Sequence, residues 1–158
     1  MKKYWLFLIC FFCTVFSVWP ESILINIRRN DTADYNEKTL FLAYAFEDGV
    51  MDELFESGHI IFNTELKNGS SADDVPLFLA REEGAEYLLN IYISCRESEN
   101  PEDNLLTSVE FTLFDVARNQ TVTAGKISIE NQPDTGQTAR DVSFTLGKQT
   151  AQKSLEAL

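Results

Sequence analysis

The residues whose types and spacing could carry out chemistry lie between positions 48 and 59 of the chain. Asp48, Asp52 and Glu56 are four residues apart, so an α-helix would align their carboxylates along one face. Divalent cations such as Ca²⁺ and Mg²⁺ prefer several oxygen ligands, which this ladder could supply. The alternative is a solvated face of an acidic helix, and we favour it. We therefore predict no metal site and no cofactor, with these three carboxylates as the only candidate ligands.

His59 is the only histidine in the sequence, so a pair of histidine ligands is not available, and a Ser-His-Asp triad could use only this residue. It follows Gly58 at an expected helix-to-strand turn, where a surface histidine is common. Asp115 lies near an expected hairpin turn, where an aspartate usually bonds to its own backbone. The sequence contains no glycine-rich phosphate loop, zinc-ligand spacing or nucleophile elbow. We predict no catalytic residue.

The charge of the chain restricts its partners. The 158 residues carry a net charge of −12 and show no basic stripe. Such a charge favours solubility and repels phosphate backbones and anionic membrane surfaces. We therefore do not expect nucleic acid as a partner. An apolar content of 44% is typical of a folded domain rather than of a disordered segment.

The beginning of the sequence has the pattern of a secretory signal. Lys2 and Lys3 precede an apolar run that extends to Trp19. The run is shorter than the roughly 20 apolar residues that a membrane-spanning helix usually needs, so we predict no permanent membrane span. Lipid attachment requires a small residue directly before the modified cysteine, whereas Cys10 and Cys13 each follow a large one. Retention of the segment as an anchor remains the alternative.

Cleavage between Ser17 and Val18 would remove a signal peptide of residues 1–17 and leave residues 18–158 as a single domain. Two lysines leave with the peptide, so 11 basic and 25 acidic residues remain, a net charge of −14. The product would be periplasmic or secreted. Only Cys95 remains after cleavage, and it cannot form a disulfide within the chain. We expect it to behave as a small buried hydrophobic residue. A dimer joined through it is the alternative.

The hydrophobic periodicity predicts a single α/β domain, with the element order β-α-β-α-β-β-β-α around one mixed sheet. Strands are expected over residues 22–28, 59–66, 85–95, 106–116 and 120–130, and helices over residues 35–57, 74–83 and 138–158. A bulge at Gly125 would keep Val122, Ala124, Ile127 and Ile129 facing inward. Core positions are expected for eight phenylalanines: Phe41, Phe46, Phe55, Phe62, Phe78, Phe111, Phe114 and Phe144.

Two segments resemble bacterial envelope proteins. The segment 80–89, Ala-Arg-Glu-Glu-Gly-Ala-Glu-Tyr-Leu-Leu, resembles the helix-to-strand junction of the TolB amino-terminal domain, CsgG and LpoB. The segment 111–122 resembles their hairpin of two strands, with Asn119 where those proteins usually have glycine; both residues tolerate a positive φ. The resemblance implies the same α/β fold. It also implies a protein that binds, gates or activates other envelope proteins and is not an enzyme.

The sequence therefore favours a non-enzymatic exported envelope protein that acts through contacts with other envelope proteins. The alternative is an exported protein that binds a divalent cation or a small molecule, or a hydrolase. Asp48, Asp52, Glu56 and His59 are the only candidate site residues for that alternative.

Overall fold

The computed structural model describes residues 20–29, 37–64, 67–68, 74–96, 105–128 and 138–158. The predicted signal peptide and its cleavage site lie outside these residues. Within them, the predicted order β-α-β-α-β-β-β-α is confirmed, with one additional strand of two residues, β3.

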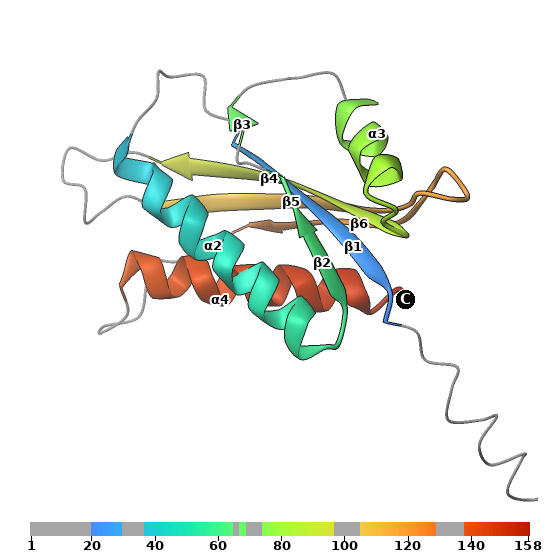
Figure 1. Ribbon diagram of the computed structural model, residues 1–158. Helices are drawn as coiled ribbons and strands as arrows, with labels where there is room; N and C mark the ends of the chain where they lie inside the picture. Colours follow the sequence, from blue (N-terminus) through green and yellow to red (C-terminus); the bar gives the residue numbers. More distant parts are fainter. Residues whose placement is uncertain (1–19, 30–36, 65–66, 69–73, 97–104, 129–137) are drawn as a thin grey trace, which may run out of the picture.

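The strands form one mixed sheet in the order β2-β1-β4-β5-β6 (Figure 1). β1 pairs in parallel with both β2 and β4, whereas β4-β5 and β5-β6 are antiparallel. The short β3 pairs with β1 in parallel, outside this path. The strand bounds are β1 Ser22–Arg29, β2 Ile60–Asn63, β3 Lys67–Asn68, β4 Tyr87–Arg96, β5 Leu105–Asp115 and β6 Gln120–Ser128.

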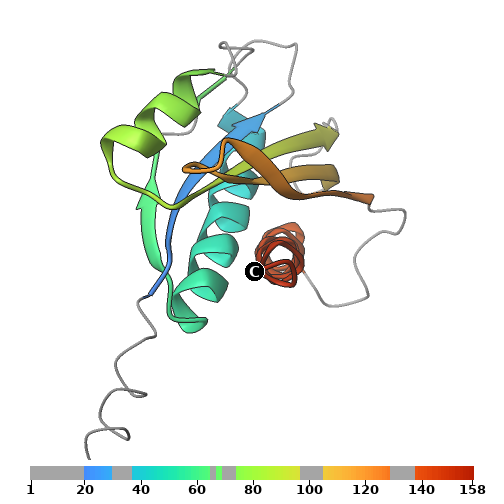
Figure 2. The same cartoon turned by 90° about the vertical axis from the view of Figure 1, so that its right-hand side faces the viewer.

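Three helices cover the two faces of the sheet. α2 (Glu37–Glu56) and α4 (Ala139–Leu155) lie side by side on one face, and α3 (Asp74–Glu82) packs on the other (Figure 2). β1 and β4 are in the middle of the sheet, and both of their faces are therefore covered. The alternating residues of β4 pack on both faces: Leu89, Ile91 and Ile93 pack under α2 and α4, and Leu88 packs towards α3.

α2 and α4 approach each other at two glycines. A Cβ atom on Gly147 would lie closer than 3.0 Å to the Phe46 carbonyl oxygen of α2. Reciprocally, a Cβ atom on Gly49 would lie closer than 3.0 Å to the Phe144 carbonyl oxygen of α4. Because neither glycine has a side chain, the backbones of the two helices can come into direct contact.

Apart from Leu146, the buried face of α4 is made of small and polar residues. Ser143, Thr150 and Ser154 are buried, and each hydroxyl donates a hydrogen bond of 2.8 Å to the carbonyl four residues earlier. Their polar groups are thereby satisfied inside the helix. Gly147 and Ala151 are also buried, whereas Leu158 is exposed.

Two helices end in the same cap. Gly58 after α2 and Gly84 after α3 both have positive φ, of 85° and 72°. In α3, the Gly84 N–H donates to the Arg81 carbonyl and the Ala85 N–H donates to the Ala80 carbonyl, which is a Schellman motif. The segment that resembles envelope proteins is therefore a helix cap followed by the start of β4. Its glycine is needed for the backbone conformation.

The structure corrects the predicted bulge. Gly125 pairs in register with Phe111, and a Cβ atom on it would touch the Phe111 ring. The register shift instead lies opposite Leu113 and Phe114, so the extra residue is Val122. Val122 packs partly against the core, Ala124 is exposed, and Ile129 lies outside the described residues. The aromatic side chain of β5 thus uses the space above the glycine, and the bulge forms elsewhere.

Candidate functional site

The outward face of α2 carries aromatic residues. Phe55, Tyr44 and Phe41 are 76%, 51% and 40% exposed. Their spacing places them on one side of the helix, together with Asp48 and Asp52, and opposite the buried residues Ala43, Val50 and Leu54. An outward helix face is normally polar, so three large aromatic residues on it mark a surface that is suited to contacts.

This exposure corrects part of the predicted core. Phe41, Phe55 and Phe78 are exposed, whereas Phe46 and Phe111 are buried as expected. The exposure could have been predicted from the helical periodicity, because Phe41, Tyr44 and Phe55 lie on the opposite side of the helix from Ala43 and Val50. The expected core position of Phe55 is therefore wrong.

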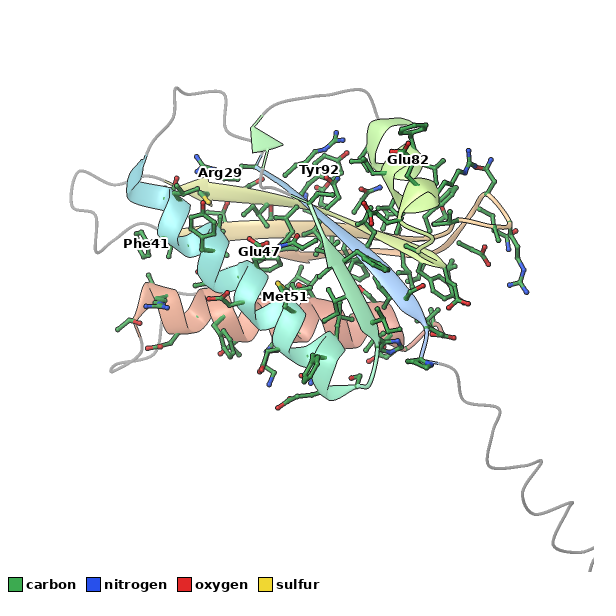
Figure 3. The ribbon with its side chains drawn as sticks, viewed as in Figure 1. Arg29, Phe41, Glu47, Met51, Glu82 and Tyr92 are labelled. Atoms are coloured by element: carbon green, nitrogen blue, oxygen red, sulfur yellow. The ribbon has the colours of Figure 1, made fainter. Side chains whose placement is uncertain are left out.

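β2 lies next to this face of α2, and the two elements enclose a groove. Asp48, Met51, Asp52 and Phe55 line it from α2, and His59, Ile60 and Ile61 line it from β2 and the preceding turn. Its volume is about 600 Å³. We call the groove, the exposed aromatic residues of α2 and the outer edge of β2 the α2–β2 surface. Figure 3 shows Phe41, Glu47 and Met51 projecting from α2.

The structure separates the predicted carboxylate ladder. Asp48 and Asp52 border the groove, but Asp52 and Glu56 also bind Lys148 of α4, with their oxygens 2.8 and 2.9 Å from its Nζ. Glu53, which was not predicted, lies 3.7 Å from the same nitrogen. The hydrogen bonds that Lys148 donates to Asp52 and Glu56 raise the pKa of Lys148 above its usual range. The ammonium group of Lys148 thus pairs with Asp52 and Glu56, two of the three carboxylates that were considered as cation ligands.

Lys148 provides a test of this cluster. Lys148→Met should lower the melting temperature at low ionic strength, because it leaves three neighbouring carboxylates without their common cation. The loss should shrink between about 0.02 M and about 0.5 M NaCl, since salt screens the repulsion among exposed charges. Lys153→Met removes the same charge from the exposed last turn of α4 and is the control. Equal losses and equal salt dependence in the two variants would contradict a specific role for Lys148.

His59 lies in the wall of the groove rather than on the open surface that the sequence suggested. Its side chain is mostly buried, and Nδ1 lies 3.8 Å from Oε2 of Glu21. Nδ1 has no hydrogen-bond partner among the described residues. Asp48, Asp52 and His59 are thus brought to one groove, and Glu56 is directed to Lys148.

Glu47 is a buried carboxylate that the sequence analysis did not identify. It accepts a hydrogen bond from Nδ2 of Asn63, so it joins α2 to β2 beside the groove. Burial raises the pKa of Glu47, the Asn63 bond lowers it, and the nearby Asp48 raises it; the net direction is upward. The sequence alone does not predict this pair, because Glu47 lies in α2 and Asn63 lies in β2.

The raised pKa of Glu47 predicts a pH-dependent effect of Glu47→Gln. The folded protein binds a proton at Glu47 more tightly than the unfolded chain, so this contribution to stability is present below the unfolded pKa. It is lost as the pH rises through the folded pKa. Glutamine keeps the acceptor for Asn63 but carries no charge. Glu47→Gln should therefore be more stable than the wild type at neutral pH.

The advantage of Glu47→Gln should disappear as the pH falls below the ordinary value of 4.5. Urea unfolding across this pH range measures the difference. Glu82→Gln, at an exposed position of α3, is the matched control and should show no such trend. A constant difference at every pH would contradict the assignment.

The remaining candidates have structural surroundings. Asp115 accepts a hydrogen bond of 2.7 Å from the Arg118 N–H, which confirms the predicted turn bond. Cys95 is half-buried and packs against the core, and a dimer through it stays a prediction. Among the described side chains, no group of three or more His, Cys, Asp or Glu is arranged to hold a metal ion. None of the described helices has the length and apolar character needed to cross a bilayer.

The fold is a mixed α/β sandwich with two helices on one face and one on the other. No family model matches the sequence, and no curated protein matches it significantly. Solved structures do share the fold. The hypothetical protein CT253 from Chlamydia trachomatis is 13% identical, with a TM-score of 0.54 over 87% of this chain and 96% of that one.

The PelC dodecamer from Paraburkholderia phytofirmans is 14% identical, with a TM-score of 0.51 over 87% of this chain and 88% of that one. The LpoB C-terminal domain from Salmonella enterica is 19% identical over 73% of this chain and 87% of that one, with a TM-score of 0.40. TolB from Acinetobacter baumannii also matches. The TM-score of the TolB match is 0.41, over 87% of this chain and 29% of that one. The likeness to CsgG stays a prediction.

Proposed function

We propose that this chain is a non-enzymatic, exported envelope protein that acts by binding other proteins through the α2–β2 surface. The observation that carries the proposal is the exposure of Phe41, Tyr44 and Phe55 beside a groove and a sheet edge. Large exposed apolar side chains gathered on one surface favour protein contacts. The PelC structure with this fold is a dodecamer, so surfaces of this fold can take part in assembly, which supports the proposal.

Photocrosslinking in intact cells tests the proposed surface. A benzoylphenylalanine residue at Phe55 should give discrete higher-mass products with envelope proteins. The same residue at Gln149, which is exposed on α4, is the control. A second crosslinking position on the same surface is Tyr44. Products of equal yield and pattern at Phe55 and Gln149, or no product at either Phe55 or Tyr44, would contradict the proposal.

Export is a separate part of the proposal and rests on the Lys2-Lys3 pair and the apolar run to Trp19. The mature domain would be residues 18–158. Cell fractionation and mass spectrometry of the amino terminus should find the chain in the periplasm or the medium, beginning at Val18. A full-length chain that stays with the membrane fraction would favour the anchor alternative.

The second candidate function is the binding of a divalent cation or a small molecule, and one observation favours the small molecule. Asp48, Asp52 and His59, three of the four residues predicted for it, line the same groove. Titration with Ca²⁺ or Mg²⁺ during thermal melting tests the cation, because a ligand that binds the folded state must raise the melting temperature. The absence of a shift at millimolar cation would remove this candidate.

A further inference from the structure

The outer edge of β2 has backbone groups available for another strand. Within the described part of the chain, β2 ends the sheet and pairs only with β1. The Ile60 N–H donates to the Glu21 carbonyl at 2.9 Å, and the Thr64 N–H donates to the Ile25 carbonyl at 3.2 Å. Alternate residues of a parallel strand bond to the same neighbour, so the N–H and C=O groups of Ile61 and Asn63 face away from β1.

This edge lacks the usual protection against pairing, although it is short. Its four residues, Ile60 to Asn63, include no lysine, no proline and no bulge. Natural proteins commonly place such features on open edges to prevent the addition of a foreign strand. The β2 edge is therefore compatible with the binding of an extended peptide by strand addition.

The groove beside the edge would receive the side chains of such a strand. In an added strand, alternate side chains point to the α2 side of the sheet, where the groove lies. Its volume of about 600 Å³ is within the usual range for binding sites and can accommodate a large apolar side chain. Met51, Phe55 and Ile61 provide the apolar walls.

Charge identifies the chemistry of the occupant. The groove is bordered by two carboxylates, Asp48 and Asp52, and the chain has a net charge of −12. A segment with lysine or arginine on either side of an apolar residue would complement these charges. A second copy of the chain is less suitable, because a symmetric β2–β2 contact would bring the same carboxylates of both copies together.

We propose that the β2 edge and its groove bind an extended segment of a partner protein by strand addition, with basic residues flanking an apolar anchor. The anchor enters the groove between Met51 and Phe55, a flanking basic residue pairs with Asp48, and the backbone pairs with Ile61 and Asn63. This inference rests on the proposed function and specifies the partner chemistry of the same surface.

A labelled peptide with the sequence Thr-Lys-Thr-Leu-Thr-Lys-Thr is a suitable probe, because lysine and leucine share one face when it is extended. Fluorescence anisotropy with the full chain should show saturable binding that weakens with salt. The peptide with glutamate in place of both lysines should bind at least about tenfold more weakly. Equal binding of the two peptides would overturn the proposed charge pairing.

N-methylation tests the strand geometry. Methyl groups on the nitrogens of the residues of one parity should abolish binding, whereas methyl groups on the other parity should leave most of it, since only one edge of the peptide pairs with β2. Equal effects of the two methylation patterns would contradict strand addition and indicate another bound form, such as a helix.

Variants of the protein locate the site. Asp48→Lys should weaken the lysine peptide at least about tenfold and strengthen the glutamate peptide, a reversal that loss of folding cannot produce. Phe55→Ser should weaken both peptides. Phe78→Ser changes an exposed phenylalanine of α3, on the opposite face of the sheet, and is the matched control. Equal losses in Phe55→Ser and Phe78→Ser would overturn the location.

The outcomes separate this inference from the proposed function. If crosslinks form at Phe55 in cells but no peptide binds, the surface contacts proteins and strand addition is wrong. If the peptides bind as described but no crosslink forms, the site has the inferred chemistry and the proposed cellular role fails. A concentration-dependent dimer in sedimentation that is abolished by Asp48→Lys or Phe55→Ser would instead assign the edge to a second copy and overturn the inference.

Discussion

Replacing Gly147 by alanine is expected to destabilise the protein by about 2 kcal/mol, in the range that overpacking of a close contact costs. The added methyl group would overlap the Phe46 carbonyl oxygen of α2, which is backbone and cannot move without displacing the helix. The sign of the change in unfolding free energy is informative, because replacing glycine by alanine in an uncrowded helix interior would stabilise the protein by roughly 1 kcal/mol. Thermal or urea unfolding measures the change, and the melting temperature should fall by on the order of 5–10 °C.

Thr145→Ala, at an exposed position of α4, is the control for helix propensity and should be neutral or slightly stabilising. Gly49→Ala should be as harmful as Gly147→Ala, because its methyl group would meet the Phe144 carbonyl oxygen. The double variant should lose less than the sum of the two, since the first substitution already separates the helices. A Gly147→Ala protein that is more stable than the wild type would show that the two backbones do not touch.

The glycine contact also affects the proposed site. α2 is held against the sheet on one side and against α4 on another, so its outward face has a fixed direction. Lys148, which follows Gly147, holds Asp52 and Glu56 on the α4 side of that face. The groove beside β2 is thus formed by a helix that is fixed through its neighbours, which reduces the cost of ordering when a partner binds.

The order of the elements could be predicted because local patterns were sufficient. β4 alternates Leu89, Ile91 and Ile93 with Leu88 and Tyr92, which indicates a strand covered on both sides, and the structure confirms it. The caps at Gly58 and Gly84 were also readable, because a glycine after a helical stripe commonly ends the helix. In each case the information lies within a few consecutive residues.

The predictions that were wrong or incomplete concern contacts between residues that lie far apart in the sequence. Lys148 and Glu56 are separated by 92 positions and meet only because α4 packs beside α2. Without that contact, the carboxylate ladder could be interpreted only as a cation site or a solvated face. The bulge was placed at Gly125 because glycine often marks one, but this glycine instead leaves space for the Phe111 ring from the neighbouring strand.

The candidate site was only half visible in the sequence. Asp48, Asp52 and His59 were identified for their chemistry, and the structure brings them to one groove. Phe41 and Phe55 were assigned to the core, because a phenylalanine is usually buried. Their direction follows from which side of α2 faces the sheet, and that is a property of the assembled fold.

Asp115→Ala is expected to cost about 1–2 kcal/mol, because it removes the acceptor that closes the β5–β6 turn. Asp115 is buried, and its carboxylate accepts the Arg118 N–H at 2.7 Å and lies 3.3 Å from the Arg118 guanidinium. Asn119, which follows Arg118 in the turn, has a φ of 55° and accepts a hydrogen bond of 3.0 Å from Arg81 of α3. Loss of the turn bond should therefore also weaken the attachment of α3 to the sheet.

Two further variants distinguish the turn bond from the ion pair at Asp115. Asp115→Asn keeps an oxygen acceptor and should recover most of the stability lost in Asp115→Ala, as measured by urea unfolding. Arg118→Ala removes a side chain that is 73% exposed and should change stability little, because exposed ion pairs contribute little. If Asp115→Asn were as unstable as Asp115→Ala while Arg118→Ala was equally harmful, the ion pair would be the stabilising contact. The order Ala, then Asn, then wild type, with Arg118→Ala close to wild type, would assign the stability of the hairpin to the backbone hydrogen bond.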